Sequence, residues 1–163
     1  MRVAVVSDTH LPRGARRLPA ECIQRLRAAD LVLHAGDVTR RSFWDELCGL
    51  GPPVEGVHGN MDEPALAALL PETRVVEAAG VRIGMIHIPG PRAGREPRLV
   101  RRFPDCHAVV YGHTHMPQVD RWERVWILNP GSPTERRRAP SRSMLELEVA
   151  NGEVAPELVR LGP

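Results

Sequence analysis

Lysine is absent from this sequence of 163 residues, so all 22 basic residues are arginine. We interpret the absence as a coding bias of a GC-rich genome, although arginine also suits phosphate recognition. The basic residues are nearly balanced by 20 acidic residues, for a net charge of +2. This balance excludes a protein whose overall electrostatic field is built to coat nucleic acid.

Cysteine is scarce, and the chain has no Cys-x-x-Cys motif for metal or redox chemistry. Cys22, Cys48 and Cys106 are widely spaced in apolar stretches, which is typical of reduced thiols in a cytosolic protein. The chain also lacks a run of 18 apolar residues and a signal-peptide pattern at its start. We therefore expect a cytoplasmic protein without a membrane partner.

The length favours one compact unit, residues 1–163, because domains commonly have about 100 to 200 residues. Hydrophobic residues make up 42% of the chain and charged residues 26%. These fractions are typical of globular proteins and differ from those of disordered chains. We expect the chain to fold on its own as a single domain.

Short runs rich in Val, Ile and Leu predict seven strands. They cover residues 3–6, 31–33, 54–57, 81–86, 108–111, 125–128 and 144–149. The early runs lack strict alternation, which is typical of strands covered on both faces. Residues 144–149 do alternate, so we expect this strand to have one face in water.

Helical patterns lie between the early strands. Residues 18–29 form the first, with Pro19 in its first turn. Ser42 resembles the N-cap of the second, which Gly49 or Gly51 ends.

Asp62 can cap a third helix, which Pro71 ends, and a weaker helical pattern covers residues 98–103. Alternating strands and helices predict parallel βαβ units, whereas the last third of the chain predicts strand after strand. We therefore expect an α/β protein in which two mixed sheets pack together with helices outside.

Five short motifs carry residue types that bind metals, and each follows an apolar strand. They are Asp8-Thr-His10, Gly36-Asp37, Gly59-Asn60, His87 and Gly112-His113-Thr-His115. Successive motifs lie close to one βα unit apart. Because the carboxyl ends of parallel strands meet at one edge of a sheet, we expect these side chains to converge.

The ligand types in these motifs suit a pair of metal ions. Three carboxylate or amide groups and four imidazoles would give each ion about four protein ligands if Asp37 bridges them. Such a mixture suits transition metals better than Mg or Ca. We predict two divalent ions, with manganese first and Fe, Zn, Co or Ni as alternatives. An extended backbone would turn Asp8 and His10 to the same side, whereas a bend would send one of them to a neighbouring ion.

The motifs, in this order and spacing, resemble the calcineurin-like metallophosphoesterase superfamily over residues 1–132. The short length, Gly59-Asn-Met-Asp62 and Asn129-Pro-Gly-Ser132 are similar to its small single-domain bacterial and archaeal phosphodiesterases. The resemblance implies a four-layer α/β/β/α sandwich of two mixed β-sheets flanked by helices. It also implies two metal sites, one held by Asp8, His10, Asp37 and His115, and the other by Asp37, Asn60, His87 and His113.

A dinuclear metal-dependent phosphoric ester hydrolase follows from this resemblance. A hydroxide bridging the two metals would attack phosphorus in line, with Asp37, Asn60 and His87 as catalytic residues. The substrate would be a small phosphate ester, most simply a phosphodiester. A phosphomonoesterase of the same mechanism is the alternative within this class. A non-catalytic protein-interaction scaffold is another, because the retromer coat uses the same fold in its scaffold subunit.

The sequence departs from the superfamily in two places. Met61 replaces a His that is thought to assist the departing oxygen; His58 could serve instead, or could simply be packed. His87-Ile-Pro-Gly90 replaces the His-Gly-His of the subgroup. Arg92 or Arg95 in the following loop could then bind phosphate, or both could be solvated surface residues.

The remaining signals are weaker. We interpret His34 as support for the loop that carries Asp37, and His107 as structural. The arginine run 136–138 is typical of a solvated loop, so we disfavour a nucleic-acid partner. The sequence is compatible with a homo-oligomer and does not specify the physiological substrate.

Overall fold

The computed structural model describes residues 1–162, which form ten strands and four helices. Their order is β1 (Arg2–Val6), α1 (Ala20–Ala28), β2 (Leu31–His34), α2 (Arg41–Cys48), β3 (Val54–Gly56), α3 (Pro64–Leu69), β4 (Thr73–Ala78), β5 (Val81–Ile86), α4 (Arg95–Arg102), β6 (Ala108–Tyr111), β7 (Gln118–Trp122), β8 (Val125–Asn129), β9 (Ser143–Ala150) and β10 (Glu153–Arg160). None of the helices within these residues is long and apolar enough to cross a bilayer.

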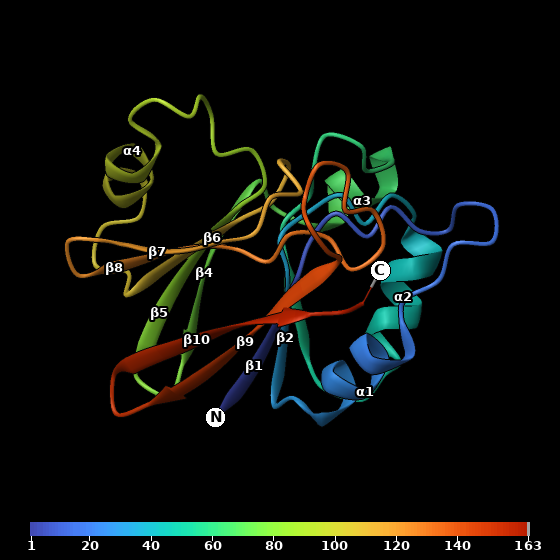
Figure 1. The fold of residues 1–163 in the computed structure, drawn as a ribbon, viewed down its shortest axis with the longest axis horizontal. Helices are drawn as coiled ribbons and strands as arrows, with labels where there is room; N and C mark the ends of the chain where they lie inside the picture. Colours follow the sequence, from blue (N-terminus) through green and yellow to red (C-terminus); the bar gives the residue numbers. More distant parts are fainter. Residues whose placement is uncertain (163) are drawn as a thin grey trace.

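The strands form two five-stranded mixed sheets. The first has the order β10-β9-β1-β2-β3 and the second the order β4-β5-β6-β8-β7. In each, three neighbouring strands are parallel, namely β1-β2-β3 and β5-β6-β8. Figure 1 shows α1 and α2 outside the first sheet and α4 beyond the second. The predicted α/β/β/α sandwich is confirmed.

The packing explains why the early strands lack alternation. Val3 and Val5 of β1 belong to the apolar cluster that joins the two sheets. Ala4 and Val6, on the opposite face, pack in a cluster with Leu26 of α1. Strand β1 therefore buries both faces, as expected for a parallel strand between a second sheet and a helix layer.

Strand β9 has one buried and one solvent-exposed face, as its alternation predicts. Leu145, Leu147 and Val149 are buried, whereas Glu148 and Ala150 are exposed. Met144 is also buried, because it packs into the helix-facing cluster. The carboxyl-terminal strand β10, which the sequence pattern did not predict, pairs with β9 along its whole length.

Two predicted helix caps are wrong. Helix α2 begins at Arg41, so Ser42 lies inside it. Instead of a local cap, the backbone N–H of Arg41 donates to the Glu63 carboxylate over 2.6 Å. Asp62 caps no helix, because its carboxylate accepts the N–H groups of Thr39 and Gly59 at 2.5 and 2.6 Å. A residue distant in sequence thus takes the place of the local cap of α2.

The other predicted helix limits agree with the structure more closely. Pro19 precedes the first helical residue of α1 and does not lie within its first turn. Gly49 is the C-cap of α2, as predicted. Helix α3 ends before Pro71, and its last cap residue, Leu70, has extended backbone, as expected for a residue that precedes proline.

Candidate metal centre

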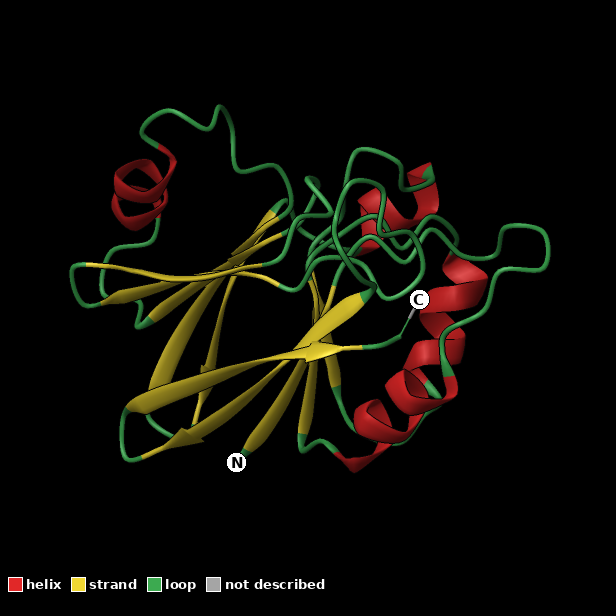
Figure 2. Cartoon of the chain, viewed as in Figure 1, coloured by secondary structure: helices red, strands yellow, loops and turns green. Residues whose placement is uncertain are grey.

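The seven predicted ligands follow five strands that end at the same side of the two sheets. Figure 2 shows the loops gathered at this side of the molecule. Five of the seven residues have left-handed backbone, with φ between 47° and 69°; they are Asp8, His10, Asp37, His113 and His115. Such φ values are uncommon outside glycine and cluster at functional sites. The chain therefore bends sharply at these three motifs and does not continue the strand.

The first ligand group consists of Asp8, His10 and His115. The Nε2 atom of His115 lies 3.3 Å from Asp8 Oδ1 and 3.3 Å from His10 Nε2. All three side chains are buried. Ligand atoms about 2.0 to 2.1 Å from a tetrahedral metal ion stand roughly 3.3 Å from one another. The third separation, from His10 Nε2 to Asp8 Oδ1, is longer at 3.9 Å, so the three atoms surround a space close in size to that of one cation.

The second group consists of Asp8, Asp37 and His87. The Nε2 atom of His87 lies 3.3 Å from Asp37 Oδ2 and 3.9 Å from Asp8 Oδ1. Asp37 Oδ2 is also 3.7 Å from His10 Nε2, in the first group. The two carboxylates therefore lie between the two sets of imidazoles, where each can serve two ions.

Asn60 and His113 lie beside the second group. The side-chain oxygen of Asn60 is 3.0 Å from His113 Nδ1. The rings of His113 and His87 meet edge to face, with centroids 5.3 Å apart. All seven predicted residues thus belong to one connected cluster.

Carbonyl oxygens fix the orientation of two of the imidazoles. His87 Nδ1 lies 2.7 Å from the carbonyl of Ala35, and His115 Nδ1 lies 2.5 Å from the carbonyl of Glu135. A carbonyl only accepts, so each Nδ1 carries the proton and each Nε2 turns a lone pair into the cluster. Among residues 1–162, no hydrogen bond satisfies His87 Nε2 or Asp8 Oδ1. These unpartnered atoms fit a site built for cations.

Asp8 is held in its ionised form. Burial opposes ionisation, but the neighbouring imidazoles of His115 and His87 and the hydroxyl of Ser7 outweigh it and lower the pKa of Asp8. Its second oxygen accepts the Ser7 hydroxyl at 2.7 Å and the His113 N–H at 3.0 Å. One oxygen is therefore anchored by the protein, while the other faces the imidazoles.

Asp37 has a similar balance. Burial raises its pKa, but the neighbouring imidazole of His87 and the hydrogen bond from the Met61 N–H lower it below the usual value. The Met61 N–H lies 2.8 Å from Asp37 Oδ1. Oδ1 thus positions the carboxylate and leaves Oδ2 for the cluster.

His34 supports the loop before Asp37, as predicted. Its Nδ1 accepts the Gly36 N–H at 3.2 Å, so its Nε2 carries the proton and donates to the Thr9 hydroxyl at 3.0 Å. Complete burial lowers the pKa of His34 to about 3. His34 is therefore neutral and joins the loops that carry the first two motifs.

Glycines precede three of the candidate ligands because side chains from other loops occupy the space that a Cβ atom would need. A Cβ atom at Gly59 would lie 2.1 Å from Asp37 Oδ1, and one at Gly112 would lie 2.0 Å from Ser7 Oγ. One at Gly36 would lie 2.6 Å from His87 Nδ1. The glycines of the motifs let the loops approach closely enough to form one cluster.

The three predicted substrate-binding residues lie outside this network. Arg95 stacks over the ring of Tyr111, 5.3 Å from its centroid, and donates to the Gly90 carbonyl at 3.2 Å. Arg92 is exposed, and His58 is partly buried. Within residues 1–162, no hydrogen bond or ion pair joins these three side chains to the seven ligands. Their contact with substrate stays a prediction.

The sequence reasoning missed the support that the loop after β8 gives to the cluster. The Ser132 hydroxyl donates to the Asp8 carbonyl at 2.8 Å and accepts the Glu135 N–H at 2.9 Å. Buried Asn129 donates to the Gly112 carbonyl at 3.1 Å. The motif Asn129-Pro-Gly-Ser132 could have indicated this role, because polar side chains that become buried need hydrogen-bond partners.

The fold and the cluster define an α/β/β/α protein with a candidate metal site between two sheets. Residues 1–152 match the calcineurin-like phosphoesterase superfamily domain. The chain is also 37% identical over 152 residues to a probable metallophosphoesterase of Methanocaldococcus jannaschii, which covers 91% of this chain and 76% of that protein. The chain therefore belongs to the calcineurin-like phosphoesterase superfamily.

Solved structures show the same architecture. A Thermotoga maritima protein determined by solution NMR is 34% identical, with a TM-score of 0.77 over 98% of this chain and 99% of that one. Vps29 from Entamoeba histolytica, crystallised in complex with zinc, is 28% identical, with a TM-score of 0.76 over 99% of this chain and 100% of that one. The likeness thus extends over nearly the whole chain.

Proposed function

We propose that this chain is a phosphodiesterase that uses two divalent transition metal ions. The observation that carries the proposal is the pair of ligand groups, in which imidazole lone pairs and carboxylate oxygens face one another at 3.3 to 3.9 Å. Unpartnered, buried Asp8 Oδ1 and His87 Nε2 would otherwise be costly. Membership of the superfamily supports the same function.

One ion would be held by Asp8, His10, Asp37 and His115, and the other by Asp37, Asn60, His87 and His113. Asp37 is the proposed bridge, because its Oδ2 lies 3.7 Å from His10 in the first set and 3.3 Å from His87 in the second. The mixture of oxygen and imidazole suits manganese, iron, zinc, cobalt or nickel. Manganese is our first candidate, and the zinc complex of Vps29 supports a transition metal.

When bound, two such ions would activate water and neutralise the charge on a phosphate ester. The residues of the chain have complementary tasks. Asp37 fixes the spacing of the two sites, and Asn60 and His87 hold the second site. Because Met61 carries no proton for the departing oxygen, the enzyme suits substrates with good leaving groups. A singly charged diester needs fewer positive groups than a dianionic monoester, so phosphomonoesters are the second choice.

A non-catalytic scaffold is the competing function. The full-length likeness to Vps29 favours it. The retained set of seven ligands, with two imidazole tautomers fixed by carbonyls, favours catalysis instead. The two functions predict different outcomes for metal-loaded protein. A scaffold and an enzyme would both bind metal, but only the enzyme would hydrolyse a phosphate ester.

We further propose a cytoplasmic location and a small phosphate ester as substrate. Three free cysteines support a reducing compartment. A homo-oligomer is compatible with this function and would be measured by light scattering.

The test uses chelator-treated protein that is then loaded with Mn²⁺. We expect hydrolysis of bis(p-nitrophenyl) phosphate to depend on the metal and to exceed hydrolysis of p-nitrophenyl phosphate. Asp37→Asn should lower kcat/KM by more than the ~10 to 100-fold typical of groups outside the ligand shell. Asp45→Asn is the matched control, because Asp45 is an exposed residue of α2 and pairs with Arg41.

Three results would contradict the proposal. Metal that binds at the cluster without any turnover of either ester would favour the scaffold. Equal activity before and after chelation would remove the metal mechanism. Full activity of Asp37→Asn would remove the proposed bridge.

A further inference from the structure

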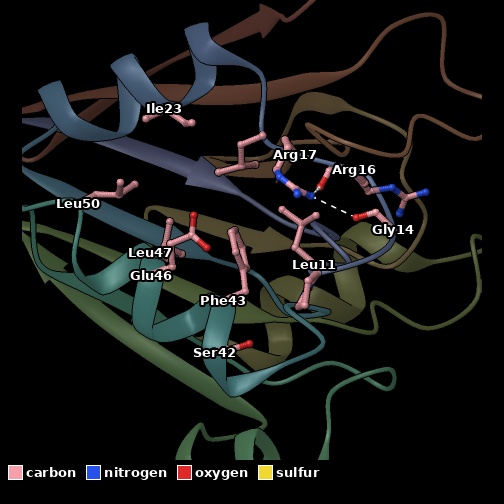
Figure 3. Close-up of a pocket in the computed structure, with 12 residues that line it drawn as sticks. Leu11, Gly14, Arg16, Arg17, Ile23, Ser42, Phe43, Glu46, Leu47 and Leu50 are labelled. Carbon is pink, nitrogen blue, oxygen red and sulfur yellow. Dashed lines mark hydrogen bonds between the residues drawn. The ribbon is translucent and has the colours of Figure 1, made fainter.

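A cavity lies between the loop after β1 and helices α1 and α2, and Leu11 in its wall directly follows the candidate ligand His10. Its volume is about 390 Å³. Figure 3 shows the apolar side chains of Leu11, Phe43 and Leu47 lining it, with Ile23 and Leu50 at its α1 and α2 sides. None of the seven candidate metal ligands lines this cavity. It is therefore a separate site.

The walls of the cavity are mainly aliphatic and rest on firmly packed residues. Leu11, Phe43 and Leu47 are only 3%, 5% and 1% exposed. Phe43 and Leu47 lie on one face of α2, and Leu11 is fixed by its N–H bond to the Val38 carbonyl at 3.1 Å. Such a preformed apolar wall suits the apolar part of a ligand, because burial there removes its surface from water.

Charged residues line the rim of the same cavity. Arg16 is already occupied, because its guanidinium lies 3.1 Å from the Glu135 carboxylate. Arg17 donates only to backbone carbonyls, those of Gly14 at 3.2 Å and Arg16 at 2.7 Å (Figure 3). Within residues 1–162, no ion pair joins Arg17 to a carboxylate. Glu46 lines the opposite wall, so the site offers one free cation and disfavours a second negative charge.

We propose that this cavity binds a small amphipathic monoanion, a carboxylate with an aliphatic body. The carboxylate would pair with Arg17, and the aliphatic part would lie against Leu11, Ile23 and Phe43. The volume supports a small molecule, because it lies near the lower end of the roughly 300 to 1,000 Å³ range of ligand pockets. The site is independent of phosphate-ester hydrolysis.

The site also shares its walls with elements that hold the metal cluster. Leu11 directly follows His10 in the chain. Arg16 pairs with the side chain of Glu135, whose carbonyl accepts the proton of His115. A ligand in the cavity would therefore contact the loop that carries the candidate metal ligands Asp8 and His10.

The test is isothermal titration of metal-free protein with sodium decanoate. We expect one saturable site per chain with a Kd below about 1 mM. Arg17→Glu should weaken binding at least about tenfold, since it replaces the free cation with an anion. Ile23→Asn should do the same from the apolar wall, and Ile23 belongs to none of the four apolar core clusters.

Matched controls distinguish the contribution of the carboxylate of decanoate from that of its aliphatic chain. Arg101→Glu, at an exposed residue of α4, and Leu69→Asn, at an exposed residue of α3, should leave the Kd of decanoate unchanged. Acetate and decyltrimethylammonium should each fail to saturate the site. The proposal is overturned if decanoate shows no saturable binding, if the cation binds as well as the anion, or if Arg17→Glu binds normally. Because metal-free protein is used, inactivity toward phosphate esters has no bearing on this result.

Discussion

The Nδ1 atom of His115 lies 2.5 Å from the carbonyl oxygen of Glu135, in a loop after the next two strands. The carbonyl accepts the imidazole proton, so the other nitrogen of His115 faces Asp8 with a free lone pair. Ser132 fixes the position of this carbonyl, because its hydroxyl bonds both the Glu135 N–H and the Asp8 carbonyl. Ser132, which does not itself face the cluster, thus helps to orient both Asp8 and His115.

Ser132→Ala should weaken metal binding without unfolding the chain. The substitution removes one hydroxyl that joins the Asp8 and Glu135 segments, and loss of such outer contacts typically costs about 10 to 100-fold in metal affinity. Titration calorimetry with Mn²⁺ measures the effect. Ser141→Ala, at a half-buried serine nearby in the chain, is the control. Equal Mn²⁺ affinity of the two variants would remove Ser132 from the support of the site.

Gly59→Ala should displace Asp37. A Cβ atom at this position would lie 2.1 Å from the Asp37 carboxylate and 2.4 Å from its backbone nitrogen. Because both loops are packed at the cluster, we expect lower stability and a large loss of Mn²⁺ binding. Gly49→Ala, at a helix cap where the closest contact would be 3.3 Å, should change neither property strongly. Normal Mn²⁺ binding by Gly59→Ala would show that Asp37 tolerates the displacement.

The stability of the metal-free protein should fall in mild acid because of His34. Its pKa is about 3 when folded and near 6.5 when unfolded, so the unfolded chain takes up a proton that the folded chain excludes. This stability is complete above pH 6.5 and is lost as the pH falls toward 3. The loss due to His34 between pH 7 and pH 5 should be about 2 kcal/mol.

Urea unfolding at the two pH values measures this loss, and His34→Gln provides the comparison. Glutamine can donate to Thr9 and accept from Gly36 but does not titrate. The variant should therefore show a smaller difference between pH 7 and pH 5 than the original protein. An equal pH dependence in both would mean that other groups cause the acid sensitivity.

Removal of metal should lower the thermal stability of the chain. Ions that bind only the folded state add about 2.7 kcal/mol at a concentration 100 times the Kd, which corresponds to roughly 5 to 10 °C in Tm. Scanning calorimetry with increasing Mn²⁺ measures the shift. Asp8→Asn should abolish most of it, because Asp8 Oδ1 takes part in both ligand groups. An Mn²⁺-dependent shift that persists unchanged in this variant would place the ion elsewhere.

The central strands and the residues of the candidate metal cluster could be predicted from local sequence. Apolar runs such as residues 3–6 and 108–111 indicate buried parallel strands, and each candidate ligand motif follows such a run. Strands β4, β7 and β10 could not be predicted in this way. They lie at sheet edges or pair in antiparallel ladders, so partly polar sequences such as that of Gln118–Trp122 become strands only through their neighbours.

The sequence by itself determined which residues are candidate metal ligands, because carboxylate, amide and imidazole side chains after apolar runs can be recognised directly in the sequence. Only the tertiary structure decided how they face one another. The carbonyls that fix His87 and His115 and the Glu63 carboxylate that accepts the first N–H of α2 are contacts between segments far apart in the chain, and the left-handed backbone at Asp8 and Asp37 lies where such segments meet. Such contacts exist only after the two sheets have packed, because no local preference specifies them.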